Sequence, residues 1–291
     1  TMYGKAEEAE IAVRFRDREV KRVRFSLSGK FTPYTVRMLE GDFVDESHYW
    51  TPENPNLFYV DYTLYAGGKV VDRAHTRFGM RKISTDVDGR VRLNDRPYYQ
   101  RLILDQGYWR ESGLTPPSAE ALKKDIELAK AMGYNGARKH QKFEDPYFYY
   151  YAEELGFLTW CEMPSAYCYC AEEVAAITAQ WQEIVAIVRQ NYNHPSVVTW
   201  VIFNESWGVR KILTDARQQE FARSLYRLTK AIDPSRPVST NDGWENSDET
   251  DIISIHDYAK FGDAFAGKYV PENYDTIYPN GGRRLMQRGC A

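Results

Sequence analysis

The stretch that decides the fold is Val197-Val198-Thr199-Trp200-Val201-Ile202-Phe203-Asn204-Glu205, in a chain of 291 residues. Its first seven residues are apolar except for Thr199, and an amide and a carboxylic acid follow them. An apolar run of this length without alternation is typical of a strand buried on both faces, as in a parallel sheet. The sequence therefore predicts a buried strand that carries Glu205 at its carboxyl end.

Similar apolar runs alternate with amphipathic helical patterns on both sides of this stretch, which is the βα arrangement of a parallel sheet. The predicted strands are Tyr98–Leu104, Gly133–Arg138, Phe157–Glu162, Val197–Glu205, Pro237–Asn241 and Ile252–His256. The predicted helices begin after Ser118, at Asp145-Pro146, at Val174 and at Thr214. These strands suit a doubly wound sheet or most of a (β/α)₈ barrel. Because no Gly-x-Gly-x-x-Gly or P-loop pattern follows any strand, we prefer the barrel.

The hydrophobic period is different before residue 85. Ile11, Val13 and Phe15 occupy every second position, and the aromatic and β-branched run 57–65 ends at the turn signal Gly67-Gly68. Strands at short spacing without a helical period predict a small β-sandwich. We therefore expect two domains, a β-sandwich over residues 1–85 and an α/β barrel over residues 86–291.

Composition narrows the function classes. Lys and Arg number 38 against 41 Asp and Glu, a net charge of −3, which argues against nucleic acid or a membrane surface as partner. No apolar stretch reaches the roughly 18 residues of a membrane span. Cys161, Cys168, Cys170 and Cys290 form no Cys-x-x-Cys pair and indicate reduced thiols rather than a metal site. A cytoplasmic location is favoured, and secretion stays open because the chain starts in mid-pattern.

Polar residues collect where the predicted strands end. In a barrel these ends meet at one mouth, which carries the function. The residues concerned are Asp105, Arg138, His140, Asn204, Glu205, Trp207, Trp244, His256 and Tyr258. Each taken alone has a plainer explanation, such as a surface acid or a packed ring, but their joint placement favours a site for a sugar. A carboxylic acid partly desolvated at such a mouth can serve as a general acid, and Glu205 is the candidate.

The segment Asn193–Gly208 resembles the acid/base signature of glycoside hydrolase family 2, which includes β-galactosidases, β-glucuronidases and β-mannosidases. Residues Trp50–Phe58 and Phe78–Arg81 look like the end of its immunoglobulin-like second domain, and Leu93–Pro97 looks like the entry into its catalytic barrel. The resemblance covers nearly the whole chain. It implies an immunoglobulin-like sandwich for residues 1–85 and a TIM-type catalytic barrel for residues 86–291.

The resemblance also implies an activity, that of a retaining exo-β-glycosidase, with a β-galactoside as the first candidate substrate and a β-glucuronide or β-mannoside next. Glu205 matches the acid/base residue, and Asn204 matches the residue that binds the sugar 2-hydroxyl. Arg138 matches the arginine that keeps the nucleophile ionised, and Tyr258 matches a tyrosine near it. His140, His256, Asp105, Trp207 and Trp244 are expected in the sugar subsite. No cofactor and no metal ion are expected.

One departure from the family concerns the nucleophile, a glutamate that ends strand seven in a Glu-Phe-Gly or Glu-Tyr-Gly motif. No such motif occurs in this sequence. We therefore expect a truncated barrel that is inactive alone, with an open six-stranded sheet and Glu205 exposed at its mouth. Open edges predict association between copies or poor order after about Phe261. The alternatives are a carbohydrate-binding module without catalysis and a scaffold in which the barrel is only structural.

Overall fold

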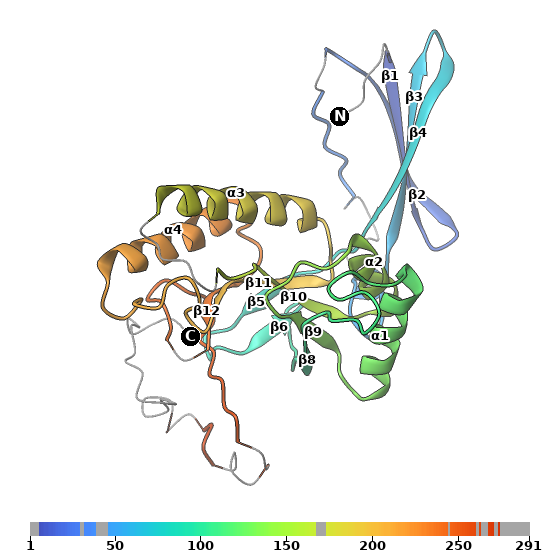
Figure 1. Ribbon diagram of the computed structural model, residues 1–291. Helices are drawn as coiled ribbons and strands as arrows, with labels where there is room; N and C mark the ends of the chain where they lie inside the picture. The colour runs from blue at the N-terminus through green and yellow to red at the C-terminus, as the bar shows by residue number, and fades with distance from the viewer. Residues whose placement is uncertain are drawn as a thin grey trace. The chain divides into compact units, whose positions relative to one another are not determined.

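The computed structural model, drawn in Figure 1, describes residues 6–29, 32–38, 46–166, 173–243, 245–259, 262, 267–270 and 273. The chain divides into two compact units. The first contains Thr1–Arg81 with the short segments Glu153–Gly156 and Asn193–Pro195. The second contains Lys82–Ala152, Phe157–Tyr192 and Ser196–Ala291.

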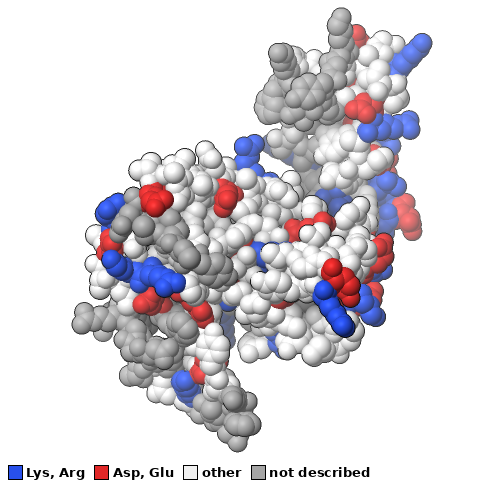
Figure 2. All heavy atoms as spheres, viewed as in Figure 1, with Lys and Arg blue, Asp and Glu red and all other residues white. Residues whose placement is uncertain are grey.

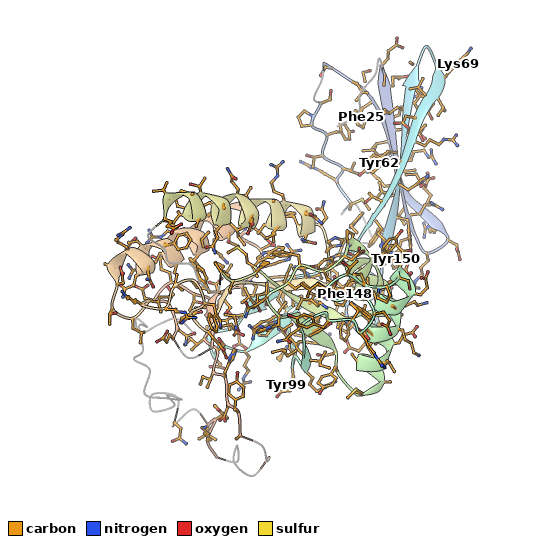
Figure 3. All side chains as sticks on the ribbon, viewed as in Figure 1. Phe25, Tyr62, Lys69, Tyr99, Phe148 and Tyr150 are labelled. Carbon is orange, nitrogen blue, oxygen red and sulfur yellow. The ribbon has the colours of Figure 1, made fainter. Side chains whose placement is uncertain are left out.

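The first unit contains an antiparallel sheet with strand order β2-β1-β3-β4. Its strands are β1 (Glu8–Phe15), β2 (Arg18–Ser26), β3 (Phe58–Ala66) and β4 (Lys69–Phe78). A short 3₁₀ helix, η2, spans Glu46–His48. The turn from β3 to β4 is made by Gly67 and Gly68, both with positive φ, as the sequence predicted. Figure 3 labels Phe25 on β2, Tyr62 on β3 and Lys69 at the start of β4.

Alternation along the strands gives this sheet one apolar and one charged face. The buried core consists of Ile11, Val13, Phe15, Phe58 and Val60. On the other face, ion pairs join β1 to its neighbours: Glu10 with Arg22, Glu8 with Arg24, and Arg14 with Asp61. Among the described residues of this unit there is one such sheet, so the second sheet of a sandwich stays a prediction.

The second unit is built on a five-stranded parallel sheet with strand order β12-β11-β10-β9-β8. Its strands are β8 (Leu102–Asp105), β9 (Gly136–Lys139), β10 (Leu158–Glu162), β11 (Val197–Asn204) and β12 (Val238–Asp242). The connecting helices are α1 (Ala119–Ala131), α2 (Pro146–Leu155), α3 (Val174–Asn191) and α4 (Ala216–Ile232). A small antiparallel sheet precedes them, made of β5 (Ile83–Thr85), β6 (Val91–Leu93) and β7 (Arg96–Pro97).

The local reasons for these elements are those seen in the sequence. Every residue of β11 is buried, which explains its unbroken apolar run. Ser118 caps α1 by accepting a hydrogen bond from the Ala121 backbone N–H at 3.1 Å. One boundary was predicted wrongly, because Asp215 rather than Thr214 caps α4.

The sixth predicted strand, Ile252–His256, is absent from the described sheet, so the prediction of six strands was wrong by one. Backbone N–H groups at the edge of β12, which a sixth strand would pair with, donate instead to side-chain oxygens of the segment that follows β12. Asp251 Oδ2 accepts from Val238 N, Thr250 Oγ1 from Thr240 N, and Ser254 Oγ from Gly243 N. Among the described residues, a single backbone bond, Asp251 N to Val238 O, joins the segment to β12.

The sheet does not close on itself within the described residues, because β8 pairs with β9 alone and β12 pairs with β11 alone. Most of the segment after Phe261, for which poor order was predicted, lies outside the described residues. No helix of the described part is long and apolar enough to cross a membrane. Figure 2 shows basic and acidic side chains interspersed on the visible face.

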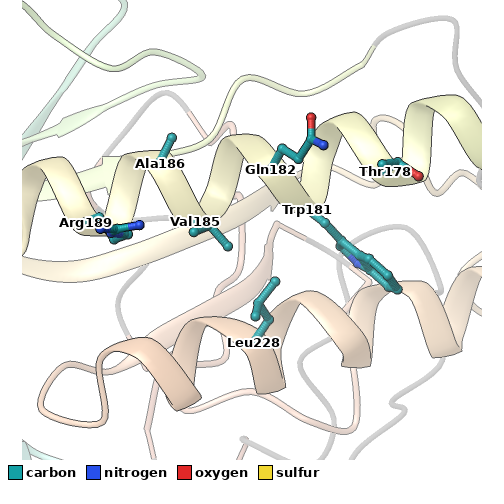
Figure 4. A pocket seen from close by; sticks show the side chains of 7 residues that line it. All are labelled: Thr178, Trp181, Gln182, Val185, Ala186, Arg189 and Leu228. Atoms are coloured by element: carbon teal, nitrogen blue, oxygen red, sulfur yellow. The ribbon is translucent and has the colours of Figure 1, made fainter.

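Helices α3 and α4 lie side by side in Figure 1 and enclose an apolar groove between them. The groove is lined by Thr178, Trp181, Gln182, Val185, Ala186, Arg189 and Leu228 (Figure 4). Trp181 is held at its rim by a hydrogen bond from its indole N–H to Ser224 Oγ at 3.2 Å. None of these residues lies at the carboxyl edge of the sheet.

The packing of β8, β9 and β10 predicts that Gly136→Ala destabilises the protein. A Cβ at this position would lie 2.6 Å from Leu158 O and 2.5 Å from Leu102 Cδ2, so the strands would have to move apart. We expect the free energy of unfolding in urea to fall by about 1–3 kcal/mol. Gly262→Ala, where nothing lies within 4 Å, is the control. Equal stability of the two variants would contradict the close packing.

Candidate active site

The carboxyl ends of four neighbouring strands meet around the guanidinium group of Arg138 on β9. Its Nε donates to Glu162 Oε2 of β10 at 2.6 Å, and its Nη2 donates to Asn204 Oδ1 of β11 at 2.7 Å. Its Nη1 pairs with Asp242 Oδ2 of β12. Arg138 and Glu162 are 10% and 0% exposed, so the strands hold a buried cation among compensating acceptors.

Glu205 follows β11 directly, where the backbone leaves the sheet in an uncommon conformation. Glu205 has a φ of 49° and Ser206 a φ of 58°, both in the left-handed region that disfavours side chains with a Cβ. Surrounding bonds hold this turn. The backbone N–H of Glu205 donates to Asp242 O at 2.8 Å, and that of Ser206 donates to Asn241 Oδ1 at 3.0 Å. Ser206 Oγ in turn donates to Glu245.

The carboxylate of Glu205 is contacted from the segment after β12. Tyr258 Oη donates to Glu205 Oε1 at 3.0 Å, and His256 Nδ1 lies 2.6 Å from the same oxygen. The other ring nitrogen of His256, Nε2, lies 3.2 Å from Asp242 Oδ2. Glu205 is 18% exposed, so the prediction of an exposed carboxylate was wrong: His256 and Tyr258 cover it.

The charges in the cluster shift the protonation equilibria of its members. Burial raises the pKa of Glu162 to about 7, although Arg138 opposes the shift. Burial acts in the same direction on Asp242, but His256 and Arg138 outweigh it and lower the pKa of Asp242. Burial acts on His256 to lower its pKa, yet hydrogen bonds with Asp242 and Glu205 prevail and raise it. The pKa of His140 is lowered by burial and by Arg138.

The structure brings together Arg138, His140, Asn204, Glu205, His256 and Tyr258. His140 follows Arg138 by two residues, and its Nδ1 lies 3.3 Å from Gln106 Nε2. Trp207 lies in the turn after Glu205, with the guanidinium of Arg210 at 4.3 Å from its ring centroid. Trp244 lies outside the described residues.

Asp105 is not part of this cluster. It is paired in register with Lys139, whose Nζ donates to Asp105 Oδ2 at 2.5 Å and also pairs with Glu144 at 2.7 Å. Side chains alternate between the faces of a strand, so Lys139 and Asp105 lie on the face opposite to Arg138. Asp105 therefore belongs to a separate ion-pair network.

Two members of the cluster, Glu162 and Asp242, were not among the predicted site residues. Both are carboxylic acids at the ends of predicted strands, which is the signal that could have found them. Among the described residues, no group of three or more His, Cys, Asp or Glu side chains is arranged to hold a metal ion. Cys161 is buried beside Tyr149, and burial raises the pKa of its thiol to about 12. Cys168, Cys170 and Cys290 lie outside the described residues.

A parallel sheet with an acid and an amide at the carboxyl end of its most buried strand places these groups where (β/α)₈ enzymes carry their active sites. The model of the TIM barrel domain of glycosyl hydrolases family 2 matches residues 116–269, and a second model of glycosyl hydrolases family 2 matches residues 4–81. The first match alone covers more than half of the chain. The chain therefore belongs to glycosyl hydrolase family 2, which confirms the resemblance seen in the sequence.

Known relatives include two kinds of β-glycosidase. The chain is 30% identical to a putative β-glucuronidase of Formosa agariphila over 79% of its length, and 27% identical to a β-galactosidase of Photobacterium profundum over 79%. It spans 28% and 22% of those proteins, about a quarter of their length. It is also similar to the structure of β-glucuronidase 2 of Bacteroides uniformis covalently bound to cyclophellitol-6-carboxylate aziridine. That match has a TM-score of 0.63 and 25% identity, and covers 79% of this chain and 29% of the other.

The buried state of Glu162 predicts a pH-dependent stability difference. Its pKa in the folded protein, about 7, lies above the ordinary value of 4.5, so the folded state holds the proton more tightly than the unfolded state. The stabilisation is complete below pH 4.5 and is lost as the pH rises through 7. Glutamine does not titrate, so the stability of Glu162→Gln does not fall in this way as the pH rises. We expect the unfolding free energy of the variant, relative to the original protein, to increase by about 2–3 kcal/mol between pH 5 and pH 8.

Urea denaturation at the two pH values measures this difference. Glu120→Gln, in the first turn of α1, is the matched control. A relative stability of Glu162→Gln that does not change with pH would show that Glu162 is ionised throughout this range.

Proposed function

We propose that the chain is part of a retaining β-glycosidase in which Glu205 is the general acid and base. The observation that carries this proposal is the arrangement of the Glu205 carboxylate at the carboxyl edge of the sheet. Both hydrogen bonds that reach it from the described residues fall on Oε1. Oε2 is therefore the oxygen that can face a glycosidic bond.

In the first half of the reaction, Glu205 protonates the leaving glycosidic oxygen while a nucleophile attacks the anomeric carbon. In the second half, Glu205 takes a proton from the water that releases the sugar. Because Arg138 holds Asn204 Oδ1, the amide N–H₂ of Asn204 points away from Arg138 and is suited to donate to the sugar 2-hydroxyl. The family role of Tyr258 near the nucleophile is compatible with its contact to Glu205.

Four other described carboxylates, at or soon after the strand ends, are poor nucleophiles. Glu162 is fully buried with a raised pKa, and Asp242 is 4% exposed and paired with Arg138. Asp257 pairs with Lys268, and Glu245 accepts from Ser206. We therefore propose that the nucleophile lies outside these residues. The covalent complex of the Bacteroides uniformis relative supports a retaining mechanism in the family.

Each of the two main observed sheets is proposed to be part of a larger fold. We propose that the four-stranded sheet is part of an immunoglobulin-like sandwich over residues 1–85, and that the five-stranded sheet over residues 86–291 is part of a (β/α)₈ barrel. The sequential parallel order of β8 to β12 supports the barrel. An open edge at β8 would favour association between copies. The substrate is a carbohydrate, and the relatives make β-galactosides and β-glucuronides the two sugars to assay.

The general-acid role predicts that Glu205→Gln in the full-length protein depends on the leaving group. Hydrolysis of glycosides with poor leaving groups should fall by roughly 10²–10⁴-fold, because these groups need a proton to depart. Aryl glycosides with activated leaving groups should lose much less in the glycosylation step. Steady-state kinetics with both substrate types measures the difference, and Glu220→Gln on the surface of α4 is the control. Equal losses for the two types would remove Glu205 from the acid role.

The missing nucleophile motif predicts that the purified 291-residue chain has no turnover with activated aryl β-galactosides or β-glucuronides. Without a nucleophile the first covalent step cannot occur, whatever the state of Glu205. A discontinuous assay over hours, with the full-length protein as positive control, tests this. Hydrolysis that disappears in Glu205→Gln would place the nucleophile within this chain.

A further inference from the structure

We propose that Asp242 is a positioning residue that acts on Glu205 through His256, so that an N–H of His256 is held on Glu205 Oε1 and Oε2 is left to carry the catalytic proton. This inference rests on the proposed function, since it assigns a part in the same reaction to a residue that the family resemblance did not single out. Asp242 does not touch the substrate in this proposal. It orients the imidazole and sets the charge beside it.

The geometry that carries the proposal is a chain of carboxylate, imidazole and carboxylate. His256 Nε2 lies 3.2 Å from Asp242 Oδ2, and His256 Nδ1 lies 2.6 Å from Glu205 Oε1. A neutral imidazole carries a hydrogen on one nitrogen only, so it can donate to one of these acceptors and not to both. Two carboxylates facing the two nitrogens therefore favour a second hydrogen on the ring, so that Nε2 donates to Asp242 Oδ2 and Nδ1 donates to Glu205 Oε1.

Burial and ion pairing fix the position of the Asp242 carboxylate, so it can orient His256. Asp242 is 4% exposed, it pairs with the buried Arg138, and it ends the strand next to the one that carries Glu205. Its backbone carbonyl accepts from the Glu205 N–H at 2.8 Å. The same residue thus fixes the backbone of Glu205 directly and the side chain of Glu205 through His256.

The other charged groups near His256 act in both directions. Arg138 on β9 places Nη1 3.3 Å from His256 Nε2 and disfavours the imidazolium. Glu162 on β10 offsets Arg138 when it is ionised. His140 stands two residues after Arg138, with a lowered pKa, and Tyr258 donates to the oxygen that His256 contacts. Asp242 and Glu205 are the two anions that face the ring, and together they outweigh Arg138.

The contacts between Asp242, His256 and Glu205 are consistent with the proton balance of the reaction. In the first half, the proton on Glu205 Oε2 moves to the glycosidic oxygen, which receives the electron pair of the broken C–O bond. The carboxylate left behind is stabilised at Oε1 by the N–H of His256 and the O–H of Tyr258. In the second half, Oε2 accepts a proton from water. His256 keeps its own proton throughout, so no external acid or base is needed.

The test is the pH dependence of kcat/KM in the full-length protein with Asp242→Asn. The alkaline limb reports loss of the proton of Glu205, whose carboxylate the N–H of His256 stabilises. Without the negative charge beside Nε2 the ring loses its second hydrogen more easily and supports the Glu205 carboxylate less, so the limb should move to higher pH by about one unit. Asp257→Asn is the control. It removes a carboxylate adjacent in sequence to His256 that is not part of the Asp242–His256–Glu205 arrangement, and it should leave the alkaline limb in place.

His256→Gln gives a second variant, which also carries the test if Asp242→Asn does not fold by circular dichroism. Without the N–H of His256 the Glu205 carboxylate is less stabilised and Glu205 holds its proton more tightly, so this limb should also move to higher pH. Adding Asp242→Asn to His256→Gln should then shift the limb by less than half of its effect in the original protein, because the imidazole that transmits the charge is gone.

The outcomes separate this inference from the proposed function. A reduced rate with an unmoved alkaline limb in Asp242→Asn would show a purely structural role and overturn the inference, while Glu205-dependent hydrolysis would stand. Additive shifts in the double variant would also overturn it, because Asp242 would then act without His256. If the full-length protein shows no hydrolysis that depends on Glu205, both the proposed function and the inference fall.

Discussion

The ion cluster around Arg138 is the interaction on which the rest of the site depends. A guanidinium buried at the end of β9 has to be compensated, and its three partners come from β10, β11 and β12. Removing one partner from such a buried group costs about 3–5 kcal/mol, so the strand ends cannot shift independently. The register of the sheet and the position of the Asn204–Glu205 pair are thus determined together. The apolar core beneath β11 supplies the stability, and the polar cluster selects one arrangement of the strand ends.

The same cluster explains why its carboxyl groups differ in chemistry although they lie at neighbouring strand ends. Glu162 has one strong donor in Arg138 and is otherwise sealed from water, so its pKa is raised to about 7. Asp242 accepts from both Arg138 and His256, and its pKa is lowered in spite of burial. A buried carboxyl with few donors and one with several are the two environments that separate protonation states. The site can therefore hold a protonated carboxyl group at Glu162 and an ionised one at Asp242, although both contact Arg138.

Much of this structure could be predicted from the sequence, because it follows from local periodicity. The buried run of β11, the Ser118 cap of α1 and the Gly67-Gly68 turn each leave a signal within a few residues. The segment 252–256 was predicted as a strand because its composition is apolar, yet side-chain groups of Thr250, Asp251 and Ser254 satisfy the backbone of β12. Asp105 was grouped with the site because it ends a strand, although alternation places it with Lys139 on the other face. Asp242 was missed because its importance lies in its partners, which belong to β9 and to the segment after β12.

The turn after β11 shows why the acid cannot be understood from its own strand alone. Glu205 and Ser206 both adopt a left-handed conformation, which costs on the order of 1 kcal/mol or more at each residue. The cost is met by hydrogen bonds from the neighbouring strand: Asp242 O accepts from Glu205, and Asn241 Oδ1 accepts from Ser206. Gly243, with a φ of 137°, lets the chain pass close to Glu205, where even a Cβ would come within 3.2 Å of Glu205 Cγ. The end of β12 therefore shapes the backbone of Glu205, and through His256 it also contacts the carboxylate. In this fold the acid is carried by one strand and positioned by the next.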